Sequence, residues 1–225
     1  MTRLAALFDR TRAQNRAALI GYFTAGDPGP VESLGLLRAA SSAGIDALEV
    51  GVPFCDPVLD GETIRRAHRR ALQHHVSLSA TLGIVGRFRD GGGVLPIVLM
   101  GYYNPILAYG PARFARAAAA AGVDAVIVAD LPIHEAAGEL LPALAGSGIT
   151  MIPLYAPNLE LRDYALRCPG LGGFLYCIPV AGPTGGASVP LSVIERAVSQ
   201  CRANSDLPIA IWRSEERRVG KECRS

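Results

Sequence analysis

The stretch DALEVGVPFCDPVLD, from Asp46 to Asp60, indicates both the fold and the site of this chain. It begins with a short apolar run, Ala47 to Val50, which is interrupted by one acid, Glu49. An acid inside such a strand faces a barrel interior or lies at its rim, because a buried carboxylate is costly unless it is paired or used in chemistry. Turn-forming residues follow, so the chain can fold Asp60 back over the end of the strand. Two carboxylates that face one pocket suit general acid and base catalysis.

Apolar strand-like runs recur outside this stretch and alternate with helical patterns. The strands are expected at Ala18 to Phe23, Ala47 to Val50, Leu95 to Met100, Ala125 to Ala129, Ile149 to Tyr155, Gly173 to Ile178 and Leu207 to Trp212. Helical patterns lie between them, for example at Pro30 to Ala43, Thr63 to Gln73, Pro111 to Ala121, Ile133 to Ala145, Leu159 to Arg167 and Pro190 to Arg202. This alternation predicts an α/β fold with a parallel sheet, either a (β/α) barrel or a doubly wound sheet. Polar and aromatic residues after most strands favour the barrel, whose carboxyl-terminal face holds the active site.

Length and composition narrow the function classes. The chain has 225 residues, of which 50% are hydrophobic, so one α/β domain is expected. The five cysteines have no CxxC spacing, which favours free thiols in a reducing cytoplasm over a zinc site or a disulfide framework. No signal peptide and no membrane-spanning run is recognised. The net charge of +2 comes from the last thirteen residues, so the folded part offers no basic surface for nucleic acid.

Several longer motifs appear in a fixed order along the chain. The most specific are FTAGDP at Phe23 to Pro28, LEVGVPFCDPVLDG at Leu48 to Gly61, and LMGYYNPILAYG at Leu99 to Gly110. Weaker matches are GVDAVIVADLP at Gly122 to Pro132, APN at Ala156 to Asn158, GFLYC at Gly173 to Cys177, and AGPTGGAS at Ala181 to Ser188. With these motifs the chain resembles the tryptophan synthase alpha subunit family, from its amino end to about residue 211. The resemblance implies a (β/α)₈ TIM barrel.

The resemblance also implies a reaction, the retro-aldol cleavage of indole-3-glycerol phosphate to indole and glyceraldehyde 3-phosphate. In this reading Glu49 protonates the indole ring carbon, and Asp60 accepts a hydrogen bond from the indole N–H as positive charge develops on the ring. A pocket that excludes water strengthens both effects. The pathway would be tryptophan biosynthesis or a related pathway that supplies indole.

Further residues receive roles from the same resemblance. The walls around the flat ring are expected to be Tyr22, Met100, Tyr102, Ile127, Ala129 and Tyr176. Thr184 and Gly185 match a loop that closes over the substrate, and Pro53, Asp56 and Asn104 are assigned to loops near an interface. The expected partner is a tryptophan synthase beta subunit in an alpha2beta2 complex. We expect no cofactor, no metal, no nucleic acid and no membrane.

Several of these residues also have a structural reading. Asp60 could cap the helix that begins at Glu62, and Tyr102 and Tyr176 could be core aromatic residues with satisfied hydroxyl groups. The RRAHRR run from Arg65 to Arg70 predicts an exposed helix face. His68, His74 and His75 are therefore expected on a solvated face rather than in a metal site.

The carboxyl end departs from the family pattern. Family members follow the seventh strand with a glycine-rich turn and have an eighth strand, and both grip the substrate phosphate through backbone N–H groups. Here the strand LPIAI runs into WRSEERRVGKECRS, in which no apolar period survives. We therefore expect a barrel domain over residues 1–211 that lacks the eighth βα unit, with about seven strands, and a non-native or disordered tail over residues 212–225.

Two alternatives to a competent lyase stay open at this point. The chain could be a non-catalytic partner that regulates a beta subunit, since the expected phosphate loops are not recognised. It could also be an inactive truncated fragment. The Glu49 and Asp60 pair favours the lyase.

Overall fold

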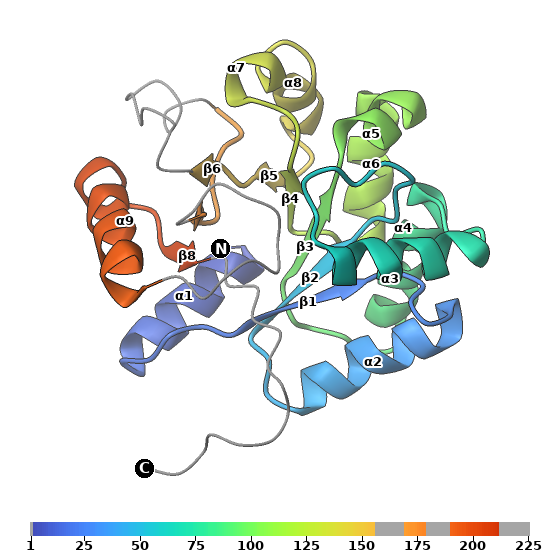
Figure 1. The fold of residues 1–225 in the computed structure, drawn as a ribbon, viewed down its shortest axis with the longest axis horizontal. Helices are drawn as coiled ribbons and strands as arrows, with labels where there is room; N and C mark the ends of the chain where they lie inside the picture. Colours follow the sequence, from blue (N-terminus) through green and yellow to red (C-terminus); the bar gives the residue numbers. More distant parts are fainter. Residues whose placement is uncertain (1, 156–168, 179–189, 212–225) are drawn as a thin grey trace.

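The computed structural model describes residues 2–155, 169–178 and 190–211, and in these segments helices alternate with short strands (Figure 1). The strands are β1 (Ile20–Thr24), β2 (Ala47–Gly51), β3 (Ile97–Gly101), β4 (Ala125–Val128), β5 (Thr150–Met151), β6 (Leu154–Tyr155), β7 (Leu175–Cys177) and β8 (Ile209–Ile211). The helices are α1 (Arg3–Ala13), α2 (Pro30–Ser42), α3 (Glu62–Gln73), α4 (Leu78–Asp90), α5 (Tyr103–Tyr109), α6 (Pro111–Ala121), α7 (Ile133–Ala136), α8 (Leu140–Leu144) and α9 (Leu191–Asn204).

All strand pairings among the described residues are parallel. One sheet has the order β1-β2-β3-β4-β5 and the other β6-β7-β8. The two sheets meet within a single stretch of chain, because β5 and β6 are separated only by Ile152 and Pro153. Proline has no N–H to donate to a ladder, which accounts for the interruption. Backbone bonds from Ile152 to Val126 and from Tyr176 to Pro153 continue the pairing on either side.

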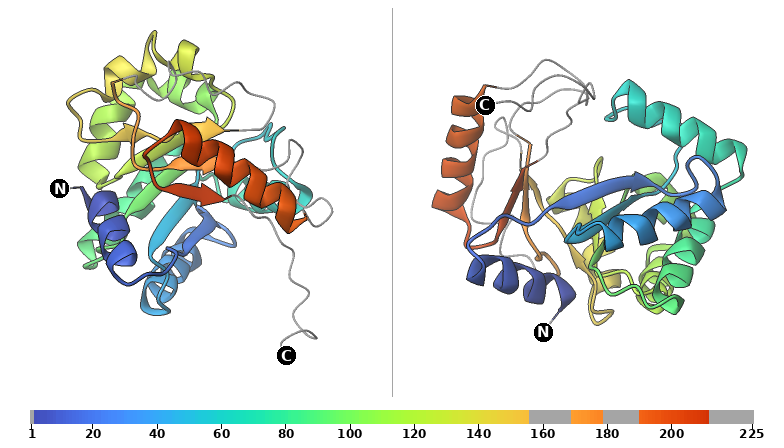
Figure 2. Two further views of the ribbon diagram at one scale, coloured as in Figure 1. Left: turned by 90° about the vertical axis from the view of Figure 1, so that its left-hand side faces the viewer. Right: turned by 90° about the horizontal axis from the view of Figure 1, so that it is seen from below.

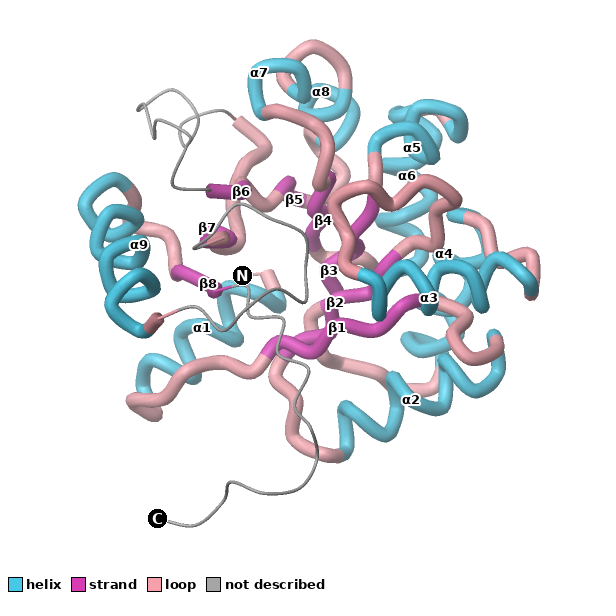
Figure 3. The backbone as a smooth tube through the Cα atoms, in the orientation of Figure 1, coloured by secondary structure: helices cyan, strands magenta, loops and turns pink. Residues whose placement is uncertain are grey.

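The two faces of the sheet carry different residues, because successive side chains of a strand point in opposite directions. On β2, Leu48 and Val50 belong to the large apolar core beneath the helices, whereas Glu49 faces the other way. Figure 3 shows the strands in the middle of the molecule with helices around them, and Figure 2 shows the same arrangement from two other sides. The inner face is therefore the interior of a barrel-like layer.

Helix α1 packs against this interior with Leu4 and Phe8. Leu4 is 2% exposed and lies near Gly173, and the ring of Phe8 meets that of Phe174 edge-on at 5.8 Å. Apolar side chains thus fill one end of the interior. The polar side chains of Asp60, Tyr102 and Asp130 follow the carboxyl ends of β2, β3 and β4.

The parallel α/β architecture predicted from the sequence is confirmed, with local corrections. The expected fifth strand is split into β5 and β6, and the expected helix from Ile133 to Ala145 is split into α7 and α8. Gly138 lies between these two helices, and glycine weakens a helix interior. Helices α1, α4 and α5 were not among the predicted ones. The expected helix from Leu159 to Arg167 lies outside the described residues, and the domain boundary after residue 211 stays a prediction.

Candidate active site

Glu49 lies in the barrel interior and is 2% exposed. Its register partners are Tyr22 on β1 and Val98 on β3, so it stands in the middle of three paired strands. The hydroxyl of Tyr176 on β7 donates a hydrogen bond of 3.1 Å to Oε2 of Glu49. Within the described part of the chain, Oε1 is buried and has no hydrogen-bond partner. A buried polar atom of this kind requires an explanation, and a ligand is one.

The surroundings of Glu49 favour its protonated form. Burial raises the pKa of this carboxyl to about 7, the hydrogen bond from Tyr176 opposes that rise, and the charge of Asp60 adds to it. A carboxyl with a pKa near 7 can both give and take a proton at neutral pH. Glu49 therefore has the environment of a general acid and base.

Asp60 ends the loop that follows β2 and is 4% exposed. Its Oδ2 accepts a hydrogen bond of 2.9 Å from the hydroxyl of Tyr102, which itself accepts one of 3.1 Å from the Leu59 N–H. Burial raises the pKa of Asp60, while the Tyr102 bond lowers it. The N-cap of α3 is Gly61 rather than Asp60. The carboxylate is thus turned toward Tyr102 and does not cap the helix.

Tyr22 stands close to both acids. Thr24 donates a hydrogen bond of 3.3 Å to its hydroxyl, and burial together with the charges of Asp60 and Glu49 raises its pKa. The ring packs against Gly51 so closely that a Cβ there would collide with the Tyr22 hydroxyl. Gly51 therefore allows the tyrosine to lie across the end of β2.

The structure brings most of the predicted wall residues together. Five of the six belong to one interior cluster: Tyr22, Met100, Ile127, Ala129 and Tyr176. The sixth, Tyr102, is 3% exposed and packs on Phe54 with ring centroids 5.1 Å apart. These residues come from β1, β3, β4 and β7 and the turns after them, which is the convergence that a barrel produces.

The predicted loop residues differ in their exposure to solvent. Pro53 is buried, whereas Asp56 and Asn104 are exposed. Thr184 and Gly185 lie outside the described residues.

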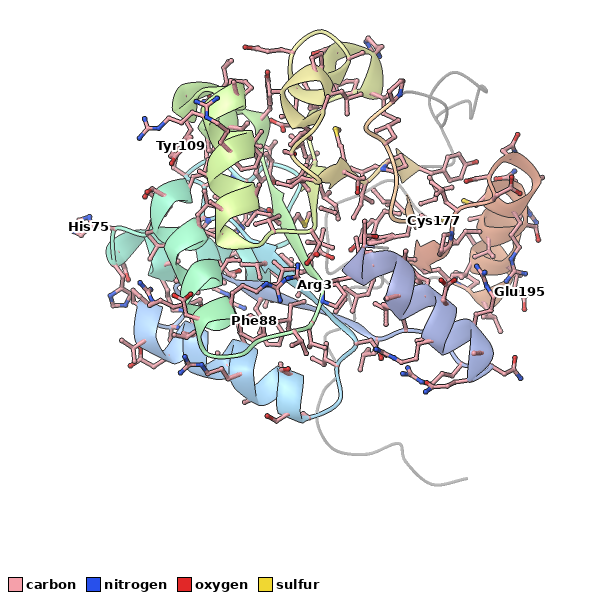
Figure 4. All side chains as sticks on the ribbon, turned by 180° about the vertical axis from the view of Figure 1, so that it is seen from behind. Arg3, His75, Phe88, Tyr109, Cys177 and Glu195 are labelled. Atoms are coloured by element: carbon pink, nitrogen blue, oxygen red, sulfur yellow. The ribbon has the colours of Figure 1, made fainter. Side chains whose placement is uncertain are left out.

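The predicted solvated face of α3 is correct for the arginines but wrong for His68. Arg65, Arg66, Arg69 and Arg70 are exposed, and so are His74 and His75 beyond the helix end. Figure 4 shows His75 at the edge of the molecule. His68 is only 2% exposed. The arginine-rich surroundings obscured this, although the 3.6-residue period does place His68 on the side of Ala67 and Ala71, which are buried. Sequence reasoning therefore missed a buried polar side chain next to the site.

His68 contacts both ends of the loop after β2. Its Nδ1 accepts a hydrogen bond of 2.9 Å from the Phe54 N–H, and its Nε2 lies 3.6 Å from Oδ2 of Asp60. Burial lowers the pKa of His68 to about 4, so the ring is neutral at pH 7.

The described residues hold no group of three or more His, Cys, Asp or Glu side chains that could bind a metal. In those same segments, no helix has the length and apolar character needed to span a membrane.

Comparison with known proteins points to one family. The family model described as "Tryptophan synthase alpha chain" matches residues 8–212. The tryptophan synthase alpha chain of Gluconacetobacter diazotrophicus is 46% identical over 212 residues, which cover 94% of this chain and 77% of the relative. That of Thioalkalivibrio sulfidiphilus is 41% identical over 94% of this chain and 79% of its own length.

Solved structures agree with the sequence matches. A structure of Mycobacterium tuberculosis tryptophan synthase superposes with a TM-score of 0.84 at 37% identity, covering 93% of this chain and 79% of the other. The tryptophan synthase alpha chain of Legionella pneumophila gives 0.83 at 33% identity, covering 94% and 76%. The expected TIM-barrel fold class is confirmed by these neighbours. With a family model matched over most of its length and relatives above 40% identity, this chain belongs to the tryptophan synthase alpha chain family.

Proposed function

We propose that this chain is a carbon–carbon lyase that cleaves indole-3-glycerol phosphate to indole and glyceraldehyde 3-phosphate, with Glu49 and Asp60 as its catalytic residues. The reaction is that of its family and belongs to tryptophan biosynthesis. The observation that carries the assignment of residues is the buried Glu49 carboxyl, with a pKa near 7 and an unpartnered Oε1 among the described residues.

In the cleavage, a proton is added to the ring carbon that bears the glycerol phosphate chain. The bond between this carbon and the side chain then breaks, and the neighbouring hydroxyl loses its proton as it becomes the aldehyde. A single carboxyl near its pKa can supply the first proton and accept the second. Glu49 suits this role because the hydrogen bond from Tyr176 leaves Oε1 available.

Protonation of the ring carbon leaves positive charge that is shared by the ring nitrogen. A carboxylate that accepts the N–H bond stabilises this charge, and burial strengthens the interaction. Asp60 suits this role because Tyr102 holds one of its oxygens. The aromatic and aliphatic side chains of the interior cluster supply a flat apolar pocket for the ring.

We assign the partner surface to the loop after β2 and to α5. Val58, Leu59 and Leu107 are 63%, 49% and 48% exposed. The Tyr102 hydroxyl at the start of α5 accepts a bond from the Leu59 N–H, so the two segments lie together, and exposed apolar side chains that gather on neighbouring segments mark a candidate interaction site. Asp56 and Asn104, also exposed, lie on the same two segments, and a tryptophan synthase beta subunit is the proposed occupant.

Indole release from indole-3-glycerol phosphate tests this function, measured with and without a beta subunit. We expect Glu49→Gln to lower kcat by about 100-fold to 10,000-fold, the usual contribution of a general acid and base. Gln keeps the size and the hydrogen-bonding capacity of the side chain but cannot transfer a proton. Release that survives in Glu49→Gln would contradict the assignment. Activation of the beta subunit without any release by the unmutated chain would favour a regulatory partner instead.

A further inference from the structure

His68 on α3 lies next to both the start and the end of the loop that follows β2. Its Nδ1 receives the Phe54 N–H near the start of the loop, and its Nε2 lies 3.6 Å from Asp60 at the end. The ring itself is carried by α3, the helix that begins immediately after this loop. With 2% exposure, the imidazole is as buried as Glu49.

The contact with Phe54 determines where the proton of the imidazole resides. A neutral imidazole has one N–H and one acceptor nitrogen. Because Nδ1 accepts the backbone N–H, the single proton of the neutral ring must be on Nε2. The nitrogen nearest to Asp60 is therefore a hydrogen-bond donor, and it has no hydrogen-bond partner within the described part of the chain.

The separation of 3.6 Å is too long for a hydrogen bond but needs only a small shift to become one. The oxygen concerned is Oδ2, which already accepts the bond from Tyr102. A second donor on Oδ2 would fix the orientation of the carboxylate and leave Oδ1 to accept a bond from the ring nitrogen.

We propose that His68 is a positioning residue for Asp60: its Nε2–H closes onto Oδ2 when substrate occupies the pocket and holds the carboxylate against the ring nitrogen. The inference rests on the proposed role of Asp60. His68 does not touch the reacting atoms, and it acts through the orientation of another side chain.

A neutral donor suits this task better than a cation. Asp60 stabilises positive charge on the ring only while it is ionised, and burial opposes its ionisation. A hydrogen bond to the carboxylate favours the ionised form. A protonated histidine would do so as well, but its charge would offset the negative charge that the ring requires. Burial keeps His68 neutral, and Arg65, the charged group that lowers the pKa of Asp60, is exposed.

Two substitutions test the roles of the two nitrogens of His68 one at a time. In His68→Asn the amide oxygen takes the place of Nδ1 and retains the acceptor for Phe54, but the donor near Asp60 is lost. In His68→Gln the amide NH₂ takes the place of Nε2 and retains that donor. We expect kcat for indole release to fall about 10-fold or more in His68→Asn, because small misplacements of catalytic groups have effects of this size. In His68→Gln, kcat should stay within about 3-fold of that of the unmutated chain, because the donor near Asp60 is retained. A change of this size is clearly smaller than the loss expected in His68→Asn.

Equal loss of kcat in both variants would mean that the ring only packs, and would overturn the proposal, as would full activity in His68→Asn. Circular dichroism and thermal unfolding check that both variants fold.

Nuclear magnetic resonance of the unmutated chain tests the geometry without reference to activity. Ring ¹⁵N signals at pH 7 should show a protonated Nε2 and an unprotonated Nδ1, and with saturating indole in the pocket Asp60→Asn should shift the Nε2–H resonance. A proton on Nδ1, or an Nε2–H resonance of the indole-bound chain that Asp60→Asn leaves unchanged, overturns the positioning role. If the chain releases no indole, the proposed function fails, while these signals still decide whether His68 faces Asp60 as a donor.

Discussion

Asp46 lies just before β2 and Glu49 lies in the middle of this strand, three residues further on; both are buried, yet their surroundings have opposite effects on the pKa. Two nitrogens of Arg16 donate to Asp46 at 2.6 and 2.8 Å, and the Leu19 N–H adds a bond of 2.9 Å. The pKa of Asp46 is lowered to about 2, chiefly by Arg16. The Tyr176 hydroxyl donates to Glu49, and burial, assisted by the charge of Asp60, raises the pKa of Glu49 to about 7.

This difference separates a structural carboxylate from a chemical one. At the amino end of the strands, Asp46 and Asp124 are satisfied by arginines and backbone N–H groups, which join neighbouring segments of the barrel. In the middle of β2, Glu49 has one oxygen, Oε1, without a hydrogen-bond partner among the described residues, which costs stability but leaves an oxygen for substrate. Carboxylates thus stabilise the fold at the amino end of the strands, whereas the carboxyl of Glu49 in the barrel interior supplies reactivity.

Removing the charge of Glu49 should give the largest change in stability. Its pKa lies above the ordinary value of 4.5, so the folded chain holds this proton more tightly and loses stability as pH rises from about 4.5 to 7. The rise corresponds to about 3 kcal/mol, because each pKa unit is worth about 1.4 kcal/mol. We expect Glu49→Gln to be more stable than the unmutated chain at pH 8 by up to about 3 kcal/mol, and little changed at pH 4.

Urea unfolding at the two pH values measures this effect. A gain of equal size at both pH values would show that the ionisation of Glu49 is not its source.

Asp46→Asn should have the opposite effect on stability, with a smaller magnitude. The neutral amide loses the charge-assisted bonds to Arg16, and hydrogen bonds to charged groups are worth about 1.5–3 kcal/mol. Because Arg16 is partly solvated, we expect a loss of about 2 kcal/mol in the free energy of unfolding at pH 7. The folded pKa of Asp46 is lowered, so its contribution is present above pH 3.8 and is lost as pH falls toward 2.

Unfolding curves for Asp46→Asn at pH 7 and pH 2 provide the measurement, with kcat for indole release as the control. The difference between variant and unmutated chain should shrink at pH 2. A large fall in kcat without a loss of stability would remove the distinction between a structural Asp46 and a catalytic Glu49.

The pattern of β2 made Glu49 predictable, because an acid in an apolar strand is visible without any knowledge of tertiary contacts. The hydrogen-bond partner of Glu49 was harder to predict from the sequence, because Tyr176 is 127 positions away and the pairing depends on how the strands come together. His68 was missed for a different reason. Its neighbours Arg66, Arg69 and Arg70 are exposed, and charge composition outweighed the helical period that places the histidine inward.

Tyr176→Phe should have the smallest effect of these variants. It tests the contrast between Glu49 and Asp46, because it changes the surroundings of Glu49 without removing its carboxyl group. The Tyr176 hydroxyl donates to Oε2 and lowers the pKa of Glu49, so its removal should raise that pKa further. If protonated Glu49 starts the cleavage, the fall in kcat at high pH reports its ionisation, and the midpoint of this fall should move to higher pH in the variant. The ring of Tyr176 stays in the interior cluster, so the pocket keeps its apolar wall. A midpoint that stays in place, or moves to lower pH, would show that the pH dependence belongs to another group and that the contrast between Glu49 and Asp46 does not govern catalysis.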